Sequence, residues 1–190
     1  MALYLARPLK RRRTLSDPDP RDLAAVLVPG DVLLTEGNSR MAALVRLVTR
    51  SSWAHVAMYV GALEAGPDPR CIVEADIADG VRAARLSELD GQRVRVLRHY
   101  SLDDTQRQRL AGWVVSRIGG QYDLAYAWAL AGTLLRLPIA PSVPQSTSRF
   151  ICSTLLAQAF VLAGCPVVPD HRYVTPRDFA STSVLQPVSS

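Results

Sequence analysis

The chain has few side chains that could perform covalent chemistry, because it holds only three cysteines and three histidines. Cys152 follows Arg149-Phe150-Ile151 and lies at the start of an apolar segment, 150–162, that we predict to be a helix. A helix N-terminus lowers the pKa of a thiol, because the helix dipole and the free N–H groups favour the thiolate. The same N–H groups can hold an oxyanion. A cysteine at such a place can equally be part of the core.

Two further side chains could complete a nucleophilic site. His55 opens an apolar segment, 55–61, that reads as a central strand, where a histidine can be a base or a structural residue. Glu74 lies inside the apolar strand 71–75, and a buried carboxylate is costly unless it is paired. An imidazole would serve as its partner.

Together these residues supply a nucleophile (Cys152), a base (His55) and an acid that orients the base (Glu74). Asp76 is the rival orienting acid, because residues two apart on a strand point to the same face. We favour Glu74, which is flanked by apolar residues on both sides.

The remaining cysteines and histidines have simpler interpretations. Cys71 starts a strand and Cys165 follows a helix-ending glycine, so both read as structural. His99 lies beside a predicted helix cap, and we expect it to be exposed. His171 lies in a turn of the tail, from which it could approach the site.

The elements that must position these residues change in type along the chain. We predict strands at 32–35, 55–61, 71–75 and 93–97, with a hairpin turn at Asp79-Gly80. The predicted helices are 40–49 after a Ser39 cap, one capped at Ser101 with apolar residues 110–118 at helical spacing, 124–137, and 150–162. Strands in the first half and helices in the second predict an α+β fold with an antiparallel sheet packed against helices.

The predicted organisation is one domain with an arm. Residues 1–22 carry Asp-Pro pairs and a basic run, so we expect a flexible Pro-rich N-terminal arm followed by a single domain over 23–190. An apolar insert spans about 124–144. It is either core packing or an apolar wall beside the site that accepts an acyl chain.

Composition excludes several function classes. The net charge is +5, but the run Lys10, Arg11, Arg12, Arg13 supplies four of these charges, so the rest of the chain has no basic footprint for nucleic acid. The run is either a solvated tail or a peripheral contact with anionic lipid or RNA. With neither a standard signal sequence nor an apolar run long enough to span a bilayer, we expect a cytoplasmic protein or one peripheral on the inner membrane.

The order of five short motifs is more specific than any single residue. Pro29–Leu34, Ser52–Gly61, Val73–Ala75 with Gly80-Val81, Gly120–Asp123 and Phe150–Ser153 follow one another along the chain. This order, over about residues 28–180, resembles the permuted papain-like amidases of the YiiX/YaeF type, the circularly permuted branch of the NlpC-type cysteine hydrolases. In ordinary members of that superfamily the cysteine helix precedes the histidine strand, whereas here the histidine strand comes first.

The resemblance implies a circularly permuted papain-like fold and a Cys–His–Glu triad, with Cys152 as nucleophile, His55 as general base and Glu74 orienting it. Tyr122 matches a Tyr-Asp pair close to the site and is a candidate for substrate binding. Two departures bear on the substrate. The family often has an acid two residues after the cysteine, where Thr154 stands here, and its Tyr-Asp pair lies closer in sequence to the cysteine.

The first hypothesis is therefore a cysteine-dependent hydrolase (an amidase, thiol protease or lipid-acyl hydrolase) or acyltransferase that forms a thioester acyl-enzyme. Its substrate would be a cell-wall peptide or a fatty acyl amide or ester, and it would need no metal or organic cofactor. The alternative is a catalytically silent binding module on the same scaffold, associated with a membrane through its basic arm.

Overall fold

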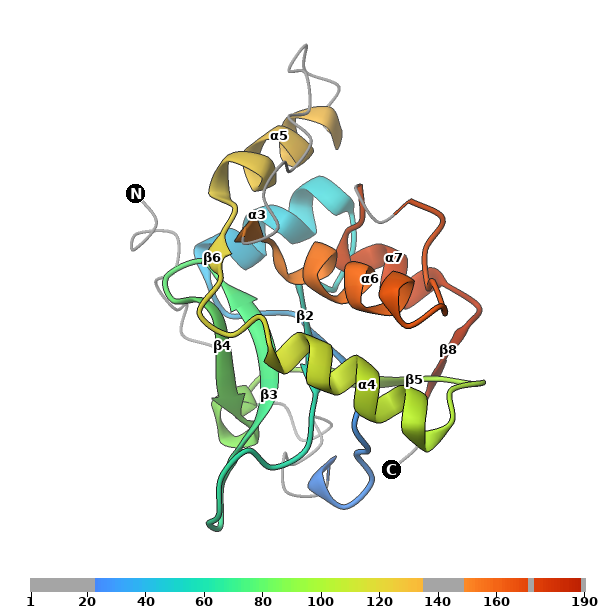
Figure 1. Cartoon of the computed structure of the whole chain (residues 1–190). Coiled ribbons are helices and arrows are strands. Elements are labelled where there is room, and N and C mark those ends of the chain that lie inside the picture. The colour runs from blue at the N-terminus through green and yellow to red at the C-terminus, as the bar shows by residue number, and fades with distance from the viewer. Residues whose placement is uncertain (1–22, 135–148, 171–172, 189–190) are drawn as a thin grey trace.

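The protein is built on a strongly twisted antiparallel sheet (Figure 1). The computed structural model describes residues 23–134, 149–170 and 173–188. Six strands follow the order β4–β3–β2–β1–β5–β8, and each pairs antiparallel with its neighbours. They are β1 (Val32–Thr35), β2 (His55–Tyr59), β3 (Arg70–Asp76), β4 (Gly80–Arg85), β5 (Val94–His99) and β8 (Leu185–Pro187). The predicted antiparallel α+β class is thereby confirmed.

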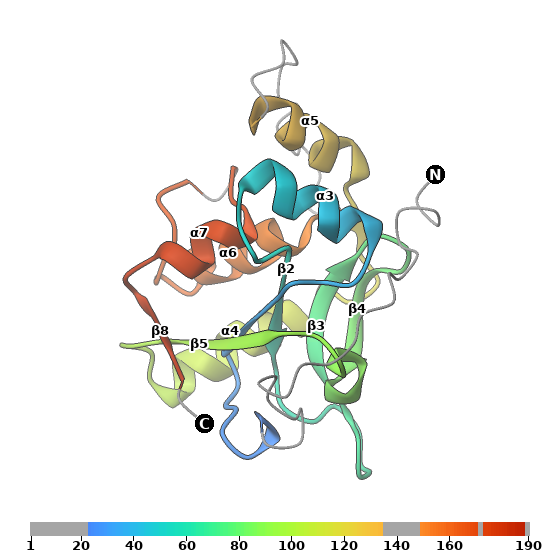
Figure 2. The same cartoon turned by 180° about the vertical axis from the view of Figure 1, so that it is seen from behind.

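Helices lie mainly on one side of this sheet, as the two views together show (Figures 1 and 2). They are α3 (Arg40–Thr49), α4 (Asp104–Val115), α5 (Leu124–Leu134), α6 (Cys152–Leu162) and the short α7 (Pro176–Ser181), with the 3₁₀ helix η1 (Leu86–Leu89) after β4. Helix α6 packs on β2 and β3, and α4 packs on α6 and β2. The helix that carries Cys152 thus lies directly against the strand that begins with His55.

Strand β1 is apolar from Val32 to Leu34 because both of its faces are covered. Val32 and Leu34 belong to the main core, which the sheet forms with α4 and α6. Leu33, between them, faces a second core that contains Leu23 and Leu89. Alternate side chains of a strand point to opposite faces, so burial on both sides explains the absence of polar alternation.

Two helices begin at polar capping residues, and at one of them the cap differs from the predicted residue. Ser39 caps α3 as predicted, and its hydroxyl accepts a hydrogen bond from the Ala42 N–H (3.1 Å). Helix α4 was expected to be capped at Ser101, but Asp103 is the cap and forms a reciprocal pair with Gln106. Serine and aspartate both cap helices well. Asp103 also has a glutamine three residues later, Gln106, and the two together form a complete capping box.

The structure corrects two further expectations and adds elements that were not predicted. The predicted helix 150–162 begins only at Cys152, because Phe150 pairs in the short strand β7 (Arg149–Phe150). His99 was expected to be exposed but is buried (4% exposed) between Tyr100 and Phe160. The tail also supplies α7 and the sixth strand, β8, neither of which was predicted.

Some predictions fall on residues that the structure does not describe. The arm 1–22, with its basic run at 10–13, lies outside the described residues, as do His171 and the part of the apolar insert after residue 134. In the described part of the chain, no helix combines the length and the apolar character that crossing a membrane requires.

Candidate active site

Strand register places His55 and Glu74 on the same face of the sheet. Met58 lies opposite Val73 and Tyr59 lies opposite Ile72 in the antiparallel β2–β3 pair. Because side chains alternate along a strand, His55 shares a face with Tyr59, and Glu74 shares it with Ile72. His55 Nε2 lies 2.8 Å from Glu74 Oε2, and the carboxylate is buried with its side chain 10% exposed.

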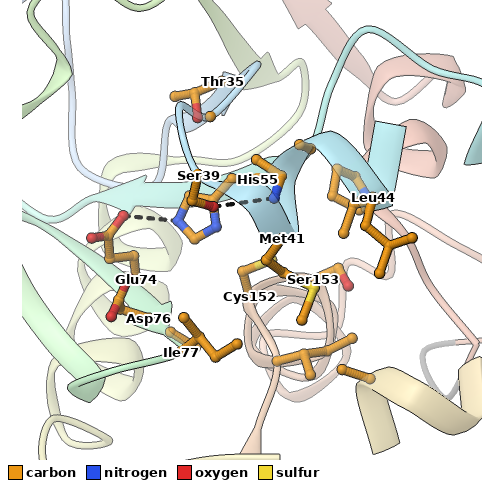
Figure 3. Close-up of a pocket in the computed structure, with 18 of the residues that line it drawn as sticks. Thr35, Ser39, Met41, Leu44, His55, Glu74, Asp76, Ile77, Cys152 and Ser153 are labelled. Atoms are coloured by element: carbon orange, nitrogen blue, oxygen red, sulfur yellow. Dashed lines mark hydrogen bonds and ion pairs between the residues drawn. The ribbon is translucent and has the colours of Figure 1, made fainter. Parts of the chain in front are cut away.

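Cys152 lies at the first position of α6, 7% exposed, on the side of the imidazole away from Glu74 (Figure 3). The helix begins there because the backbone at Ile151 is extended. Thr154, which replaces the acid expected from the resemblance, closes the first turn: its hydroxyl accepts from the Ile151 N–H (3.1 Å). The substitution therefore concerns helix capping, since a threonine here fills the role that an acid has in a capping box.

The thiol and the imidazole favour each other's charged form. Burial raises the pKa of the Cys152 thiol, but attraction and a hydrogen bond to His55, with backbone hydrogen bonds at Val56 and Ser153, bring it below its ordinary value. Burial likewise lowers the pKa of His55, but the Cys152 thiolate and the Glu74 carboxylate together raise it well above the usual value. The site therefore supports a thiolate–imidazolium pair.

The third member of the group stays ionised. Burial would raise the pKa of Glu74, but His55 and Arg82 lower it to about 2. A carboxylate can only accept hydrogen bonds, so the proton between the two residues belongs to His55 Nε2. Nδ1 is then the ring nitrogen left for the thiol. Asp76, the rival acid, does not take this place, because its Oδ1 accepts from the Ala78 N–H (2.7 Å) in the β3–β4 turn.

Arg82 is a site residue that sequence reasoning missed. Its Nη2 donates to Glu74 Oε1 (2.7 Å), so each oxygen of Glu74 has its own partner. The residue lies directly opposite Glu74 in the β3–β4 pair. The predicted turn, centred on Asp79-Gly80, would have put Arg85 there. The actual loop is Ile77–Asp79, with Gly80 at φ +72°, as in three-residue hairpins that end in a left-handed residue.

Tyr122 reaches the site although 30 residues separate it from Cys152. Strand β6 (Gln121–Tyr122) pairs in parallel with β7, and Tyr122 lies opposite Phe150, two residues before the cysteine. Asp123 then caps α5, accepting from the Tyr126 N–H (2.9 Å). Burial, followed by the nearby Cys152, Asp76 and Asp123, raises the pKa of Tyr122, so its hydroxyl remains a donor.

One pocket of about 260 Å³ is lined by the site residues His55, Glu74, Arg82, Tyr122 and Cys152. One end is apolar and is formed by α3 and α5, which lie side by side; it is lined by Met41, Leu44, Val45, Val48, Ala127, Trp128 and Ala131. The other end is mixed: it includes the polar or charged Asp76, Glu88 and Gln92 and the apolar Ile77 and Leu89. Cys152 and His55 lie between the two ends (Figure 3). The described part of the apolar insert is thus both core, through Tyr126, and pocket wall.

The other cysteines lie away from this arrangement, and burial raises the thiol pKa of both Cys71 and Cys165. Among the described residues, no three or more histidine, cysteine, aspartate or glutamate side chains are grouped so that they could hold a metal ion.

Comparisons with known proteins agree on one family and one fold. The profile of the family described as "Permuted papain-like amidase enzyme, YaeF/YiiX, C92 family" matches residues 26–188. Among solved structures, YiiX from Escherichia coli O157:H7, described as a metalloprotein, is similar with a TM-score of 0.62 and 19% identity, over 85% of this chain and 96% of that one. A search of curated proteins gave no match.

Proposed function

Since this chain belongs to the permuted papain-like amidase family of the YaeF/YiiX type, we propose that it is a cysteine hydrolase in which Cys152 is the nucleophile, His55 the general base and acid, and Glu74 the residue that orients His55. The observation that carries the proposal is the imidazole held between a thiol of lowered pKa and a buried carboxylate. Each role follows from the position of that side chain.

The proposed reaction has two steps. The Cys152 thiolate attacks the carbonyl carbon of an amide or ester, and the imidazolium of His55 protonates the leaving amine or alcohol as its bond to carbon breaks. The product is a thioester. His55, now neutral, takes a proton from water, whose oxygen attacks the thioester and releases the carboxylic acid. The thiolate and the imidazolium are thereby restored.

Charge that develops on the carbonyl oxygen needs donors. The N-terminus of α6 offers backbone N–H groups next to the sulfur, and preorganised donors of this kind stabilise an oxyanion strongly. Tyr122 lines the same pocket with a protonated hydroxyl, which supports a role for it in binding the substrate or the oxyanion.

The pocket supports an acyl chain as the group that is transferred to the enzyme. Its α3–α5 end offers mainly apolar side chains, whereas its β3–η1 end combines charged and polar side chains with the apolar Ile77 and Leu89. An apolar chain gains free energy by entering the first end, and a polar leaving group is solvated better at the second. We therefore favour fatty acyl amides or esters over cell-wall peptides as substrates.

The test is labelling with iodoacetamide from about pH 5 to about pH 9, mapped to each cysteine by mass spectrometry. At about pH 6 an ordinary thiol is only about 0.3% ionised, so Cys152 should react far faster than Cys71 or Cys165. Substitution His55→Ala should slow the labelling of Cys152 at that pH by about 100-fold.

The thiols of Cys71, which is buried, and Cys165, which is partly buried, are internal controls in the same sample. If Cys152 reacts no faster than they do, and only at high pH, the proposed catalytic pair does not exist, and a non-catalytic binding module on this scaffold becomes the better hypothesis.

A further inference from the structure

We propose that Arg82 is a positioning residue of this active site: held from outside by Glu88, its guanidinium fixes the Glu74 carboxylate in the orientation that engages His55. The inference rests on the proposed function, since it concerns how the base of the thiol is held. Arg82 touches neither the thiol nor the imidazole in any contact described above, so its effect on the thiol must pass through Glu74.

Two hydrogen bonds of Arg82 define the arrangement. Nη2 donates to Glu74 Oε1 (2.7 Å), and Nη1 donates to Glu88 Oε2 (2.8 Å). Glu88 is itself fixed, because its Oε1 accepts from the Arg85 N–H (2.9 Å) at the start of η1. A chain of hydrogen bonds therefore runs from the backbone of β4 through Glu88, Arg82 and Glu74 to His55.

The alternative, an ordinary surface ion pair, fits Arg85 better than Arg82. Arg85 lies on the same strand but faces the β2–β3 loop, where it pairs with Glu64 (2.8 Å); its side chain is 42% exposed and that of Glu64 is 29% exposed. Glu74 is only 10% exposed, so its contact with Arg82 is screened less by solvent. Arg85 is therefore a suitable control for Arg82. Both lie on β4, but of the two only Arg82 contacts Glu74.

The acidic side chains around Glu74 give Arg82 a second effect, which is to keep Glu74 ionised. Asp76 on the same strand, Asp79 in the turn and Glu88 on η1 are all acidic and lie on the same side of the pocket or beside it. Tyr122 on β6 adds a protonated hydroxyl. Removing Arg82 would take away one of the two cations that contact Glu74, the other being the His55 imidazolium, so this acidic group would favour protonation of Glu74 at higher pH.

The experiment measures iodoacetamide labelling of Cys152 against pH in Arg82→Met, Arg82→Lys and the control Arg85→Met. In Arg82→Met the carboxylate protonates at higher pH and the imidazolium loses its partner, so labelling at about pH 5 should fall about tenfold relative to the wild type, with little change at about pH 8. Arg82→Lys keeps the charge and should restore most of the labelling. Arg85→Met should match the wild type.

A double variant separates positioning from other effects. Adding Arg82→Met to Glu74→Gln should leave the pH profile of Glu74→Gln unchanged, because no carboxylate remains for Arg82 to hold. A further shift in the double variant would show that Arg82 acts by another route and would overturn the proposal. An unchanged acid limb in a folded Arg82→Met variant would overturn it as well.

Two outcomes distinguish failure of the positioning role of Arg82 from failure of the proposed function. If wild-type Cys152 is not labelled at acid pH, the proposed function fails and the positioning role fails with it. If the wild type and His55→Ala behave as proposed but Arg82→Met matches the wild type, only the positioning role is wrong. Should Arg82→Met fail to fold by circular dichroism, Glu88→Gln decides: a smaller shift in the same direction supports the role, and an unchanged profile overturns it.

Discussion

At the scale of single residues, the site depends on a glycine that carries no chemistry. Gly80 begins β4 at φ +72°, and a Cβ placed there would lie 2.2 Å from the Gly120 carbonyl oxygen. That carbonyl accepts from the Val81 N–H (2.8 Å), and the Gly119 N–H donates to the Val81 carbonyl (2.8 Å). The close approach joins β4, which carries Arg82, to the segment that leads into Tyr122.

We therefore expect Gly80→Ala, which adds a single methyl group, to lower both the stability of the fold and the reactivity of Cys152. The matched control is Gly91→Ala, because Gly91 has the same φ of +72° but nothing within 4 Å of an added Cβ. Left-handed backbone alone should cost each variant about 1–2 kcal/mol of unfolding free energy. Only Gly80→Ala should lose more and also slow Cys152 labelling, measured by urea unfolding and by iodoacetamide. Equal losses in both variants would show that the contact with Gly120 is unimportant.

At the scale of elements, the sequence predicts those segments whose burial is complete or whose caps are explicit. Strands β1, β2 and β3 consist mostly of apolar residues, and α3 has a serine cap, so all four were predicted within one or two residues. The two-residue strands β6 and β7 and the short β8 carry no periodicity, because their pairing is decided by distant partners. Tertiary contact, not local preference, forms them.

The same distinction, between local sequence signals and tertiary contacts, holds for the residues of the site. His55, Glu74 and Cys152 were predicted because each is an unusual residue type at the start of, or inside, an apolar element. Arg82 was missed because its position opposite Glu74 depends on the length of the hairpin loop, and one loop residue more or less changes the partner. The sequence left open whether the segment 124–144 is core or a pocket wall, and the contribution of α3 could not be derived, since the apolar end of the pocket forms where α3 and α5 meet.

Helix α3 allows a test of the proposed acyl pocket. Leu44 lines the pocket, whereas Leu47, one turn later, is 75% exposed and is not part of it. In Leu44→Gln, kcat/KM for a long-chain acyl amide should fall about tenfold, because roughly 1.4 kcal/mol of apolar contact is lost. A two-carbon acyl amide should be hydrolysed as before, and Leu47→Gln should affect neither substrate. Equal losses on long and short chains would contradict an acyl site along α3.

At the scale of the whole molecule, the buried carboxylate links the site to stability. The folded-state pKa of Glu74, about 2, is below its ordinary value, so its ionised form stabilises the fold at neutral pH. This stability is present above the unfolded pKa and is lost as the pH falls toward about 2. From the shift, the contribution at neutral pH is on the order of 3 kcal/mol.

Urea unfolding of the wild type and Glu74→Gln at several pH values should show this. The wild type should be the more stable protein at about pH 7, and the difference should narrow steadily below about pH 4. Glu64→Gln is the control: the pKa of Glu64 is also about 2, held there by Arg70, but that pair is exposed. Its smaller difference should vanish in high salt, whereas the Glu74 difference should persist. A difference independent of pH would contradict the assignment for Glu74.

The parallel pairing of β6 with β7 has a consequence for how such a protein can diverge. It fastens together the two ends of the stretch 123–148, whose first part, α5, forms a wall of the pocket, while Tyr122 and Cys152 stay outside that stretch. Doubling the length of a closed loop costs only about 0.6 kcal/mol. Evolution, or an engineer, could therefore replace this one contiguous cassette to change the range of substrates while leaving the reacting groups where they are.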